Sequence, residues 1–120
     1  MENNKSFGDK GERIALEYLI EKKYLILETN YKSGRNEVDI IAKHRGDIVF
    51  IEVKTRATEV FIHPEEAVNL EKQRSIISVA NNYILKNNIF ANARFDIISI
   101  ILNEKIEINH IENAFMPMPR

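Results

Sequence analysis

The chain has 120 residues, of which 44% are hydrophobic and 29% are charged, and it contains no cysteine. These values predict one globular domain over residues 1–120, and they exclude disulfides and thiolate zinc sites. The net charge of −1 argues against a strongly basic, general nucleic-acid binder, although local basic patches remain compatible with such binding. The N-terminus lacks the apolar segment of a signal peptide, and no apolar run reaches about 18 residues, so we expect a cytoplasmic protein without a membrane span.

Seven elements are predicted, in the order helix, three strands, helix, two strands. Ser6, with Asp9 three residues later, is typical of a helix N-cap, and Asn69 is a second candidate cap. Polar turns at 33–36 and 44–47 separate the first three strands. The predicted elements are a helix at 6–23, strands at 24–32, 37–43 and 48–55, a helix at 69–86, and strands at 94–102 and 105–111. Their natural packing is an α/β fold with a central mixed sheet flanked by helices.

Each predicted helix carries one polar residue on its inward face. Glu12 precedes Ala15 by three residues and Leu16 by four, so it lies near the start of the apolar stripe of the first helix. Gln73 lies four residues before Ile77, on the apolar stripe of the second helix. That second stripe consists of Ile76, Ile77, Ala80, Tyr83 and Ile84. Both polar side chains are therefore expected to face the sheet.

The second and third predicted strands carry charged residues within apolar runs. Side chains alternate along a strand, so Glu52 and Lys54 share one face, and Glu37 and Asp39 share a face of the preceding strand. Burying a charge is costly unless it is paired or binds a metal. The sequence therefore predicts that these groups are kept for chemistry.

The same residues suit the metal-assisted hydrolysis of a phosphodiester bond. Asp39 and Glu52 supply two carboxylates from adjacent strands, and the backbone carbonyl of Val53 adds a third oxygen. Oxygen ligands favour Mg²⁺ or Mn²⁺. Lys54 would contact the phosphate or the attacking water, and Glu12 could reach the cluster from the first helix. Gln73 could orient water or ligands from the second helix.

In this order, the acids and the lysine resemble the signature of the restriction-endonuclease-like (PD-D/ExK) nuclease superfamily. The match is closer to the YraN-like family of predicted bacterial endonucleases, which are similar to Holliday-junction resolvases. The matching residues are Gly8, Gly11, Glu12, Ala15, Asn30, those at 37–42, 50–56 and 72–73, Arg94, Phe95, Asp96 and those at 111–115. The resemblance covers nearly the whole chain. One departure is Asn36, where the family commonly has glycine; asparagine tolerates the left-handed conformation, so the turn can survive.

The resemblance implies a restriction-endonuclease-like fold and a DNA endonuclease. It implies that Glu12, Asp39 and Glu52 are the metal-binding acids and that Lys54 is the catalytic lysine. Branched or recombination intermediates are implied as substrates by family analogy alone. A homodimer would help, because symmetric cutting of two strands requires two sites.

Each of these residues also has an interpretation without catalysis. Glu52 and Lys54 could be an ordinary surface pair, and Asp39 could pair with Arg35 or Lys32. Glu12 could simply favour the positive end of its helix dipole.

Three further groups of residues have alternatives of the same kind. Gln73 could be a polar residue at a helix margin, and Glu37 could bond to backbone at the edge of a turn. Asp96 is expected to brace the structure through a basic partner. Three basic residues follow the acids and are candidates for phosphate contacts or for a solvated face: Arg56, Lys72 and Arg74. The three histidines show no spacing that predicts a metal site.

Two rival functions remain. The first is a non-catalytic nucleic-acid-binding accessory protein, which is suggested by the small size and the modest charge. The second is a protein that binds a partner through the tail at 117–119. Buried carboxylates and a lysine argue against the accessory protein, because a pure binder has no need to bury these groups.

Overall fold

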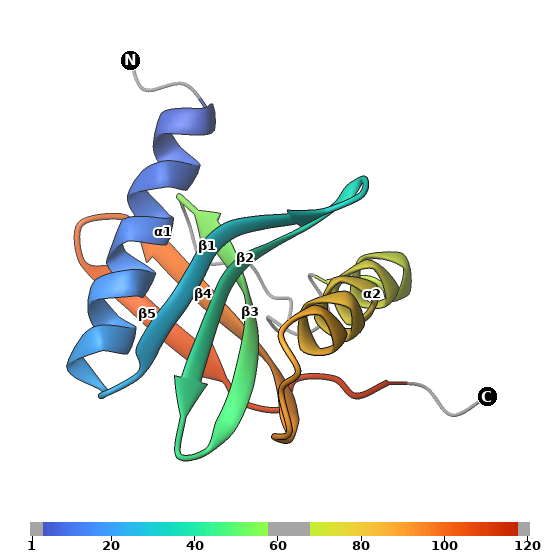
Figure 1. Ribbon diagram of the computed structural model, residues 1–120. Coiled ribbons are helices and arrows are strands. Elements are labelled where there is room, and N and C mark those ends of the chain that lie inside the picture. Colours follow the sequence, from blue (N-terminus) through green and yellow to red (C-terminus); the bar gives the residue numbers. More distant parts are fainter. Residues whose placement is uncertain (1–3, 58–67, 118–120) are drawn as a thin grey trace.

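The computed structural model describes residues 4–57 and 68–117, and it consists of two helices and five strands (Figure 1). The elements are α1 (Asn4–Glu21), β1 (Leu25–Ser33), β2 (Asn36–His44), β3 (Asp47–Arg56), α2 (Leu70–Lys86), β4 (Ala93–Leu102) and β5 (Ile106–Ile111). The predicted order of helix, three strands, helix and two strands is confirmed. Of the tail at 117–119, Met118 and Pro119 lie outside the described residues.

The five strands form one mixed sheet in the order β1-β2-β3-β4-β5. Only the central pair, β3 and β4, is parallel, and the other three pairs are antiparallel. A parallel pair needs a long crossover, and α2 lies in the segment that connects β3 to β4. The predicted mixed sheet is therefore confirmed, and its parallel pair follows from the position of α2 in the chain.

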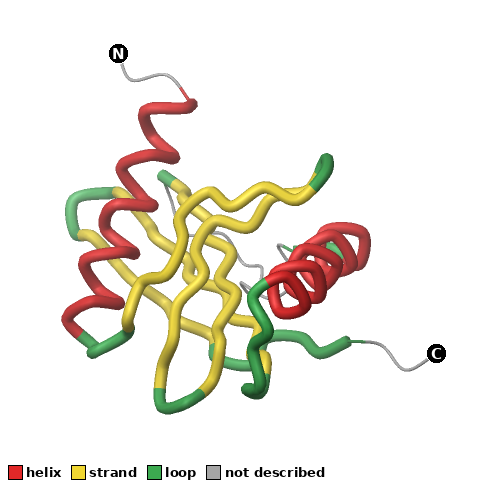
Figure 2. The backbone as a smooth tube through the Cα atoms, in the orientation of Figure 1, coloured by secondary structure: helices red, strands yellow, loops and turns green. Residues whose placement is uncertain are grey.

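The helices cover opposite faces of the sheet (Figures 1 and 2). Ala15 and Leu19 of α1 are fully buried against one face, beside Ile40, Val49 and Ile51. The other face packs against α2 and has its own apolar cluster, which includes Ile41, Phe50, Ile76, Val79, Tyr83, Phe95 and Ile97. The alternation of side chains in the central strands supplies both layers.

The helix starts agree with the sequence in one case and not in the other. Asn69 is the N-cap of α2, and its side-chain oxygen accepts a hydrogen bond from the backbone N–H of Lys72 at 2.8 Å. The expectation that Ser6 caps the first helix is wrong, because α1 already includes residues from Asn4 onward. Leu25 is 60% exposed, because it begins the edge strand β1.

Two tight turns join the first three strands. Ser33 pairs with Asn36, and Gly34 between them has a φ of 62°. His44 pairs with Asp47 around a second two-residue turn at 45–46. Both residues of that turn have positive φ, as a type I′ hairpin turn requires. Within the described residues, neither helix is long and apolar enough to cross a membrane.

Candidate functional site

A close approach of α1 to β3 sets the position of the site. Gly11 is buried in α1, and a Cβ atom at this position would overlap the side chain of Thr55 in β3. Thr55 is β-branched and has few alternative rotamers, so only glycine lets the helix come this near. Glu12, the next residue of α1, is thereby held beside the ends of β2 and β3.

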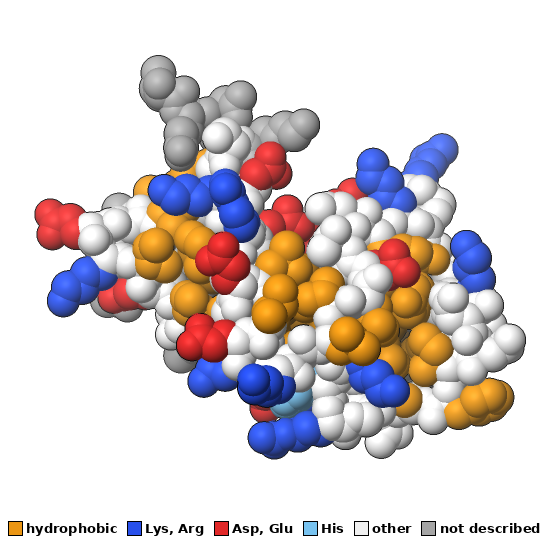
Figure 3. Space-filling model, turned by 60° about the vertical axis from the view of Figure 1, so that its left-hand side comes forward, with side chains coloured by type: hydrophobic (Ala, Val, Ile, Leu, Met, Phe, Trp, Pro, Cys, Tyr) orange, Lys and Arg blue, Asp and Glu red, His pale blue; other side chains and the backbone are white. Residues whose placement is uncertain are grey.

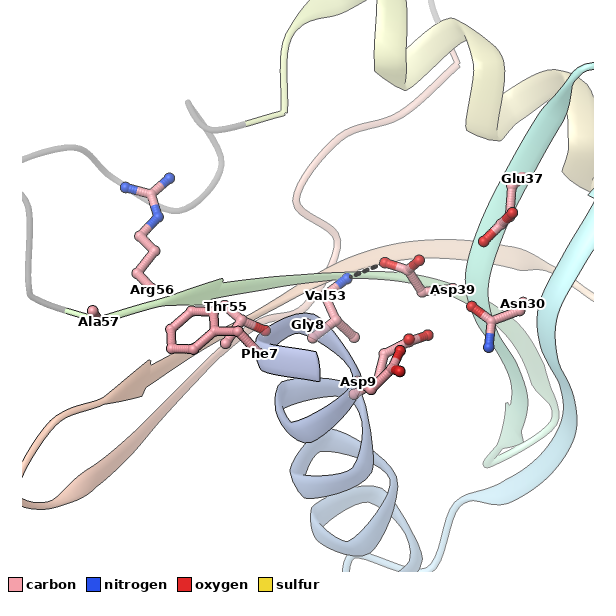
Figure 4. Close-up of a pocket in the computed structure, with 11 residues that line it drawn as sticks. Phe7, Gly8, Asp9, Asn30, Glu37, Asp39, Val53, Thr55, Arg56 and Ala57 are labelled. Atoms are coloured by element: carbon pink, nitrogen blue, oxygen red, sulfur yellow. Dashed lines mark hydrogen bonds between the residues drawn. The ribbon is translucent and has the colours of Figure 1, made fainter. Parts of the chain in front are cut away.

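A cleft of about 620 Å³ opens at this junction of helix and sheet. Figure 4 shows side chains from α1, β1, β2 and β3 around it. The described residues that line it are Phe7, Gly8, Asp9, Glu12, Asn30, Glu37, Asp39, Val53, Thr55, Arg56 and Ala57. Five residues that were predicted for the site are among them: Glu12, Glu37, Asp39, Val53 and Arg56. The cleft therefore brings together acids that are far apart in the sequence.

The side chain of Asp39 accepts a hydrogen bond from the backbone of β3 where the pairing of β2 with β3 has ended. The regular pairing of β2 with β3 begins at Ile40, opposite Ile51. Beyond that pair, the backbone N–H of Val53 donates to Asp39 Oδ2 at 2.8 Å. The N–H and the C=O of one residue in a strand point to the same edge. The carbonyl oxygen of Val53 is therefore directed toward the same edge as Asp39, as the predicted oxygen ligand set requires.

Glu52 is the buried acid of the site. Its side chain is only 5% exposed, and burial, followed by the neighbouring Asp39 carboxylate, raises its pKa to about 8. Two lysines act to lower this pKa: Lys72 Nζ lies 3.4 Å and Lys54 Nζ lies 3.9 Å from Glu52 Oε2. The raised pKa shows that these two lysines do not compensate fully for burial and for the second acid.

Glu12 is the second acid with a raised pKa. Burial raises its pKa to about 7, and Asp39, Asp9 and Glu37 add to the effect through repulsion. Asn30 moderates this crowding. With its amide nitrogen facing the acids, it donates to Glu12 Oε1 at 3.0 Å and to Glu37 Oε1 at 3.3 Å. The cleft therefore collects more negative charge than its own donors neutralise.

The remaining predicted residues lie at different distances from this cluster. Lys54 is half-buried and reaches Glu52, as expected for a lysine of the site. Lys72, a candidate for a phosphate contact or a solvated face, lies with its Nζ 3.4 Å from Glu52 Oε2. Gln73 donates through Nε2 to the carbonyl oxygen of Val68 at 2.9 Å, so it braces the start of α2. Several predicted residues are not among the described residues that line the cleft: Glu52, Lys54, Lys72, Gln73 and the exposed Arg74. Glu52 instead meets the cleft residue Asp39 from β3.

Two lining residues, Asp9 and Asn30, were not among the site residues predicted from the sequence. Asp9 precedes Glu12 by three residues, so helical spacing already puts both on one face. Asn30 faces Asp39 once the two-residue turn at 34–35 fixes the register of β1 on β2. Both residues could have been found from spacing and register alone.

A second polar cluster lies on β4 and β5. Ligand atoms of Asp96, His110 and Glu112 all lie within 4.8 Å of one another and could hold a metal ion. This corrects the expectation that no histidine belongs to such a group. Arg94, however, already donates to both oxygens of Asp96 at 3.0 and 2.9 Å. His110 Nε2 donates to Asp96 Oδ2 at 2.7 Å.

Asp96 is therefore fully satisfied by the protein itself. Burial acts to raise its pKa, but hydrogen bonds from His110, Arg94 and the backbone N–H of Asn113 hold that pKa below its usual range. The expected bracing of Asp96 by a basic partner is confirmed. A metal ion would have to compete with the Arg94 guanidinium, so the cleft at the ends of β2 and β3 is the stronger candidate for a cation site.

Comparisons with known proteins place the chain among relatives of the same length. A family model described as Uncharacterised protein family UPF0102 matches residues 11–100. A UPF0102 protein of Clostridioides difficile is 49% identical over 114 residues, which are 94% of this chain and 99% of that protein. UPF0102 proteins of Alkaliphilus oremlandii and Chloroherpeton thalassium are 47% and 41% identical. They cover 93% and 99% of this chain, and 99% and 100% of their own lengths. These names state no activity.

Proposed function

Since the chain belongs to Uncharacterised protein family UPF0102, whose name states no chemistry, we infer its activity from the geometry of the cleft. We propose that the protein is a metal-dependent endonuclease that hydrolyses phosphodiester bonds in DNA. One observation carries the proposal. Glu12 and Asp39 line the cleft and interact with each other, and Glu52 of β3 interacts with the same Asp39, with Lys54 Nζ 3.9 Å from Glu52. This arrangement also supports the restriction-endonuclease-like fold that the sequence resemblance implies.

The residues of the cleft fit a hard divalent cation. Glu12, Asp39 and Glu52 would hold Mg²⁺ or Mn²⁺ together with the carbonyl oxygen of Val53, since oxygen ligands are what these ions prefer. Burial, followed by the neighbouring acids, raises the pKa values of Glu12 and Glu52, and a bound cation would favour the ionised form of both carboxyl groups. When bound, the cation would polarise the phosphate and lower the pKa of a water molecule.

The two lysines have different tasks in this proposal. Lys72 Nζ is the nearer cation to Glu52 and holds that carboxylate in place from α2. Lys54 is 35% exposed, and its ammonium group lies farther from Glu52, at 3.9 Å. It is therefore free to turn toward a phosphate oxygen and to stabilise the charge that develops there. Arg56 lies two residues after Lys54 in β3 and lines the cleft, so it would hold the neighbouring phosphate.

The test is cleavage of labelled DNA by the purified protein. Linear duplex, single-stranded, flapped and four-way-junction substrates are each incubated with Mg²⁺, Mn²⁺ or EDTA. Metal-dependent cutting is expected, and Lys54→Ala and Asp39→Asn are each expected to lower its rate by about a hundredfold or more. Lys43→Ala, at an exposed position of β2 away from the cleft, is the matched control and should cut like the wild type.

Each outcome decides something. Cutting that survives both substitutions would identify a contaminant and refute the assignment. Binding of DNA without cutting in either metal would establish the non-catalytic accessory protein instead. A preference for the four-way junction over the linear duplex would support the branched substrate that the sequence resemblance implies.

A further inference from the structure

The hairpin of β1 and β2 extends beyond the rest of the sheet. β1 pairs with β2 as far as Ser33 and Asn36, whereas β2 pairs with β3 only from Ile40 onward. Residues 31–38, here called the arm, therefore form a two-stranded ribbon that leaves the sheet beside α2 (Figure 1). Asn30 and Asp39, at the base of the arm, line the cleft. The arm thus begins at the candidate site and points away from it.

Contacts with α2 fix the direction of the arm. Asn82 Nδ2 donates to Ser33 Oγ at 2.9 Å, close to the tip. The rings of Tyr31 and Tyr83 meet edge to face, with their centroids 5.0 Å apart. An isolated two-stranded hairpin is marginally stable in water, so these contacts keep the arm in one position.

The arm and α2 together carry more basic than acidic residues. Their basic residues are Lys32, Arg35, Lys72, Arg74 and Lys86, against the acids Glu37, which faces the cleft, and Glu71. Lys32 and Arg35 at the tip are exposed. Blue side chains stand out in the upper right of Figure 3, where the arm projects. The far edge of the sheet is acidic, with three glutamates and one lysine in residues 104–112. Although the net charge is −1, basic residues are therefore in excess on the arm and α2, and acidic residues are in excess at 104–112.

We propose that the arm grips a nucleic-acid duplex beside the cleft, with Lys32 and Arg35 on its phosphates. A two-stranded ribbon fits the major groove of B-form DNA, which is about 12 Å wide. The four residue-to-residue steps from Arg35 to Asp39 span about 13 Å, which corresponds to about four nucleotides along one DNA strand. The arm would therefore hold the duplex a few nucleotides from the bond at the cleft. The choice of DNA as the ligand rests on the proposed function, but the binding itself requires no cleavage.

The test is the binding of a labelled duplex of about 20 base pairs in EDTA, followed by fluorescence anisotropy over a range of salt concentrations. The double substitution Lys32→Gln/Arg35→Gln removes both charges from the tip of the arm. Lys43→Gln/Arg45→Gln is the matched control, because it removes two exposed charges around the other hairpin turn, at the opposite end of β2. The arm variant is expected to bind about tenfold or more weakly, and the slope of log affinity against log salt should fall by about 2. The control should stay within about twofold of the wild type.

The outcomes separate this inference from the proposed nuclease activity. If the wild type binds and the arm variant does not, the inference stands even when no metal supports cutting. If the wild type cuts DNA and the arm variant binds as tightly as the control, the arm is not the gripping element while the nuclease survives. Equal losses in both double variants would also overturn the inference, because they would reflect net charge alone. Stronger binding to a single strand than to the duplex would overturn the groove contact.

Discussion

Replacing Glu52 with glutamine is expected to stabilise the metal-free protein at neutral and alkaline pH. Most substitutions of buried residues destabilise a protein, so the direction of this prediction is unusual. It follows from the raised pKa of the carboxyl group, which means that the folded chain holds the proton of Glu52 more tightly than the unfolded chain does. Ionising Glu52 therefore acts against folding.

The sign and the size follow from the two pKa values. The pKa rises from 4.5 in the unfolded chain to about 8 in the folded one. The stability that comes from the protonated carboxyl is fully present below about pH 4.5 and is lost as the pH rises through about 8. At 1.36 kcal/mol for each pKa unit, the upper limit is about 5 kcal/mol. Glutamine also loses the ion pairs with Lys72 and Lys54, so we expect a net gain of about 2 kcal/mol at pH 8.

The assay is urea or thermal unfolding in EDTA at several pH values. A gain of about 2 kcal/mol corresponds to a rise in Tm of roughly 8 °C for a domain of this size. The difference between Glu52→Gln and the wild type should be small near pH 5 and should grow up to pH 8. Glu107→Gln, on the exposed edge strand β5, is the control and should not change with pH in this way.

Addition of Mg²⁺ or Mn²⁺ should make the wild type more stable than the Glu52→Gln variant. A cation that binds only the folded state raises its stability in proportion to the logarithm of its concentration over Kd. The wild type should therefore gain stability with metal, and the Glu52→Gln variant should gain little. If the variant is less stable than the wild type in EDTA at pH 8, the account of Glu52 as an under-neutralised acid is wrong.

Three further predictions follow from neighbouring contacts. Acids with raised pKa values must lose protons to bind a cation, so Mg²⁺ affinity should rise at least about tenfold from pH 6 to pH 8; calorimetry in buffers of different ionisation enthalpy would measure the proton release, and a constant affinity would contradict it. Gly11→Ala should cost about 1–3 kcal/mol in urea unfolding, and adding Thr55→Ala should recover part of that cost; additive losses would show that the two residues do not meet. Asp96→Asn should cost about 3 kcal/mol, with or without Mg²⁺, because it removes the buried bidentate partner of Arg94 and leaves only the exposed Glu112 at 3.6 Å; a cost that appears only with metal would instead mark Asp96 as a ligand.

The sequence predicted the elements well because their signals are local. Alternating apolar residues and two tight turns set the first three strands, and Asn69 marked the start of α2. Ser6 was wrong for a physical reason: the residues before it have no strong helix breaker, so α1 extends back to Asn4. A helix can begin at a capping residue or extend past it, and the preference of a single residue for the cap position, about 1 kcal/mol, does not by itself fix where the helix begins.

The site was predicted only in part, because tertiary packing decides what each charged residue meets. Alternation along the strands was enough to propose Asp39, Glu52 and Lys54. Spacing could not show that Lys72 lies on Glu52, or that Gln73 bonds to the backbone just before α2. Those contacts depend on the position of α2 along the sheet, which is set by the packing of its apolar face on one side of that sheet.

Two buried carboxylates on adjacent strands show what distinguishes structure from function in this fold. Glu52 on β3 is 4% exposed and Asp96 on β4 is 0% exposed, so burial alone would raise both pKa values. Asp96 instead titrates below its usual range, because a bidentate guanidinium, an imidazole and a backbone N–H are aimed at it. Glu52 has two lysines at longer range and a second acid beside it. The chain can evidently neutralise a buried acid when stability is all that matters. The incomplete neutralisation of Glu52, beside a cleft lined by further acids, therefore argues for a ligand that supplies the missing positive charge.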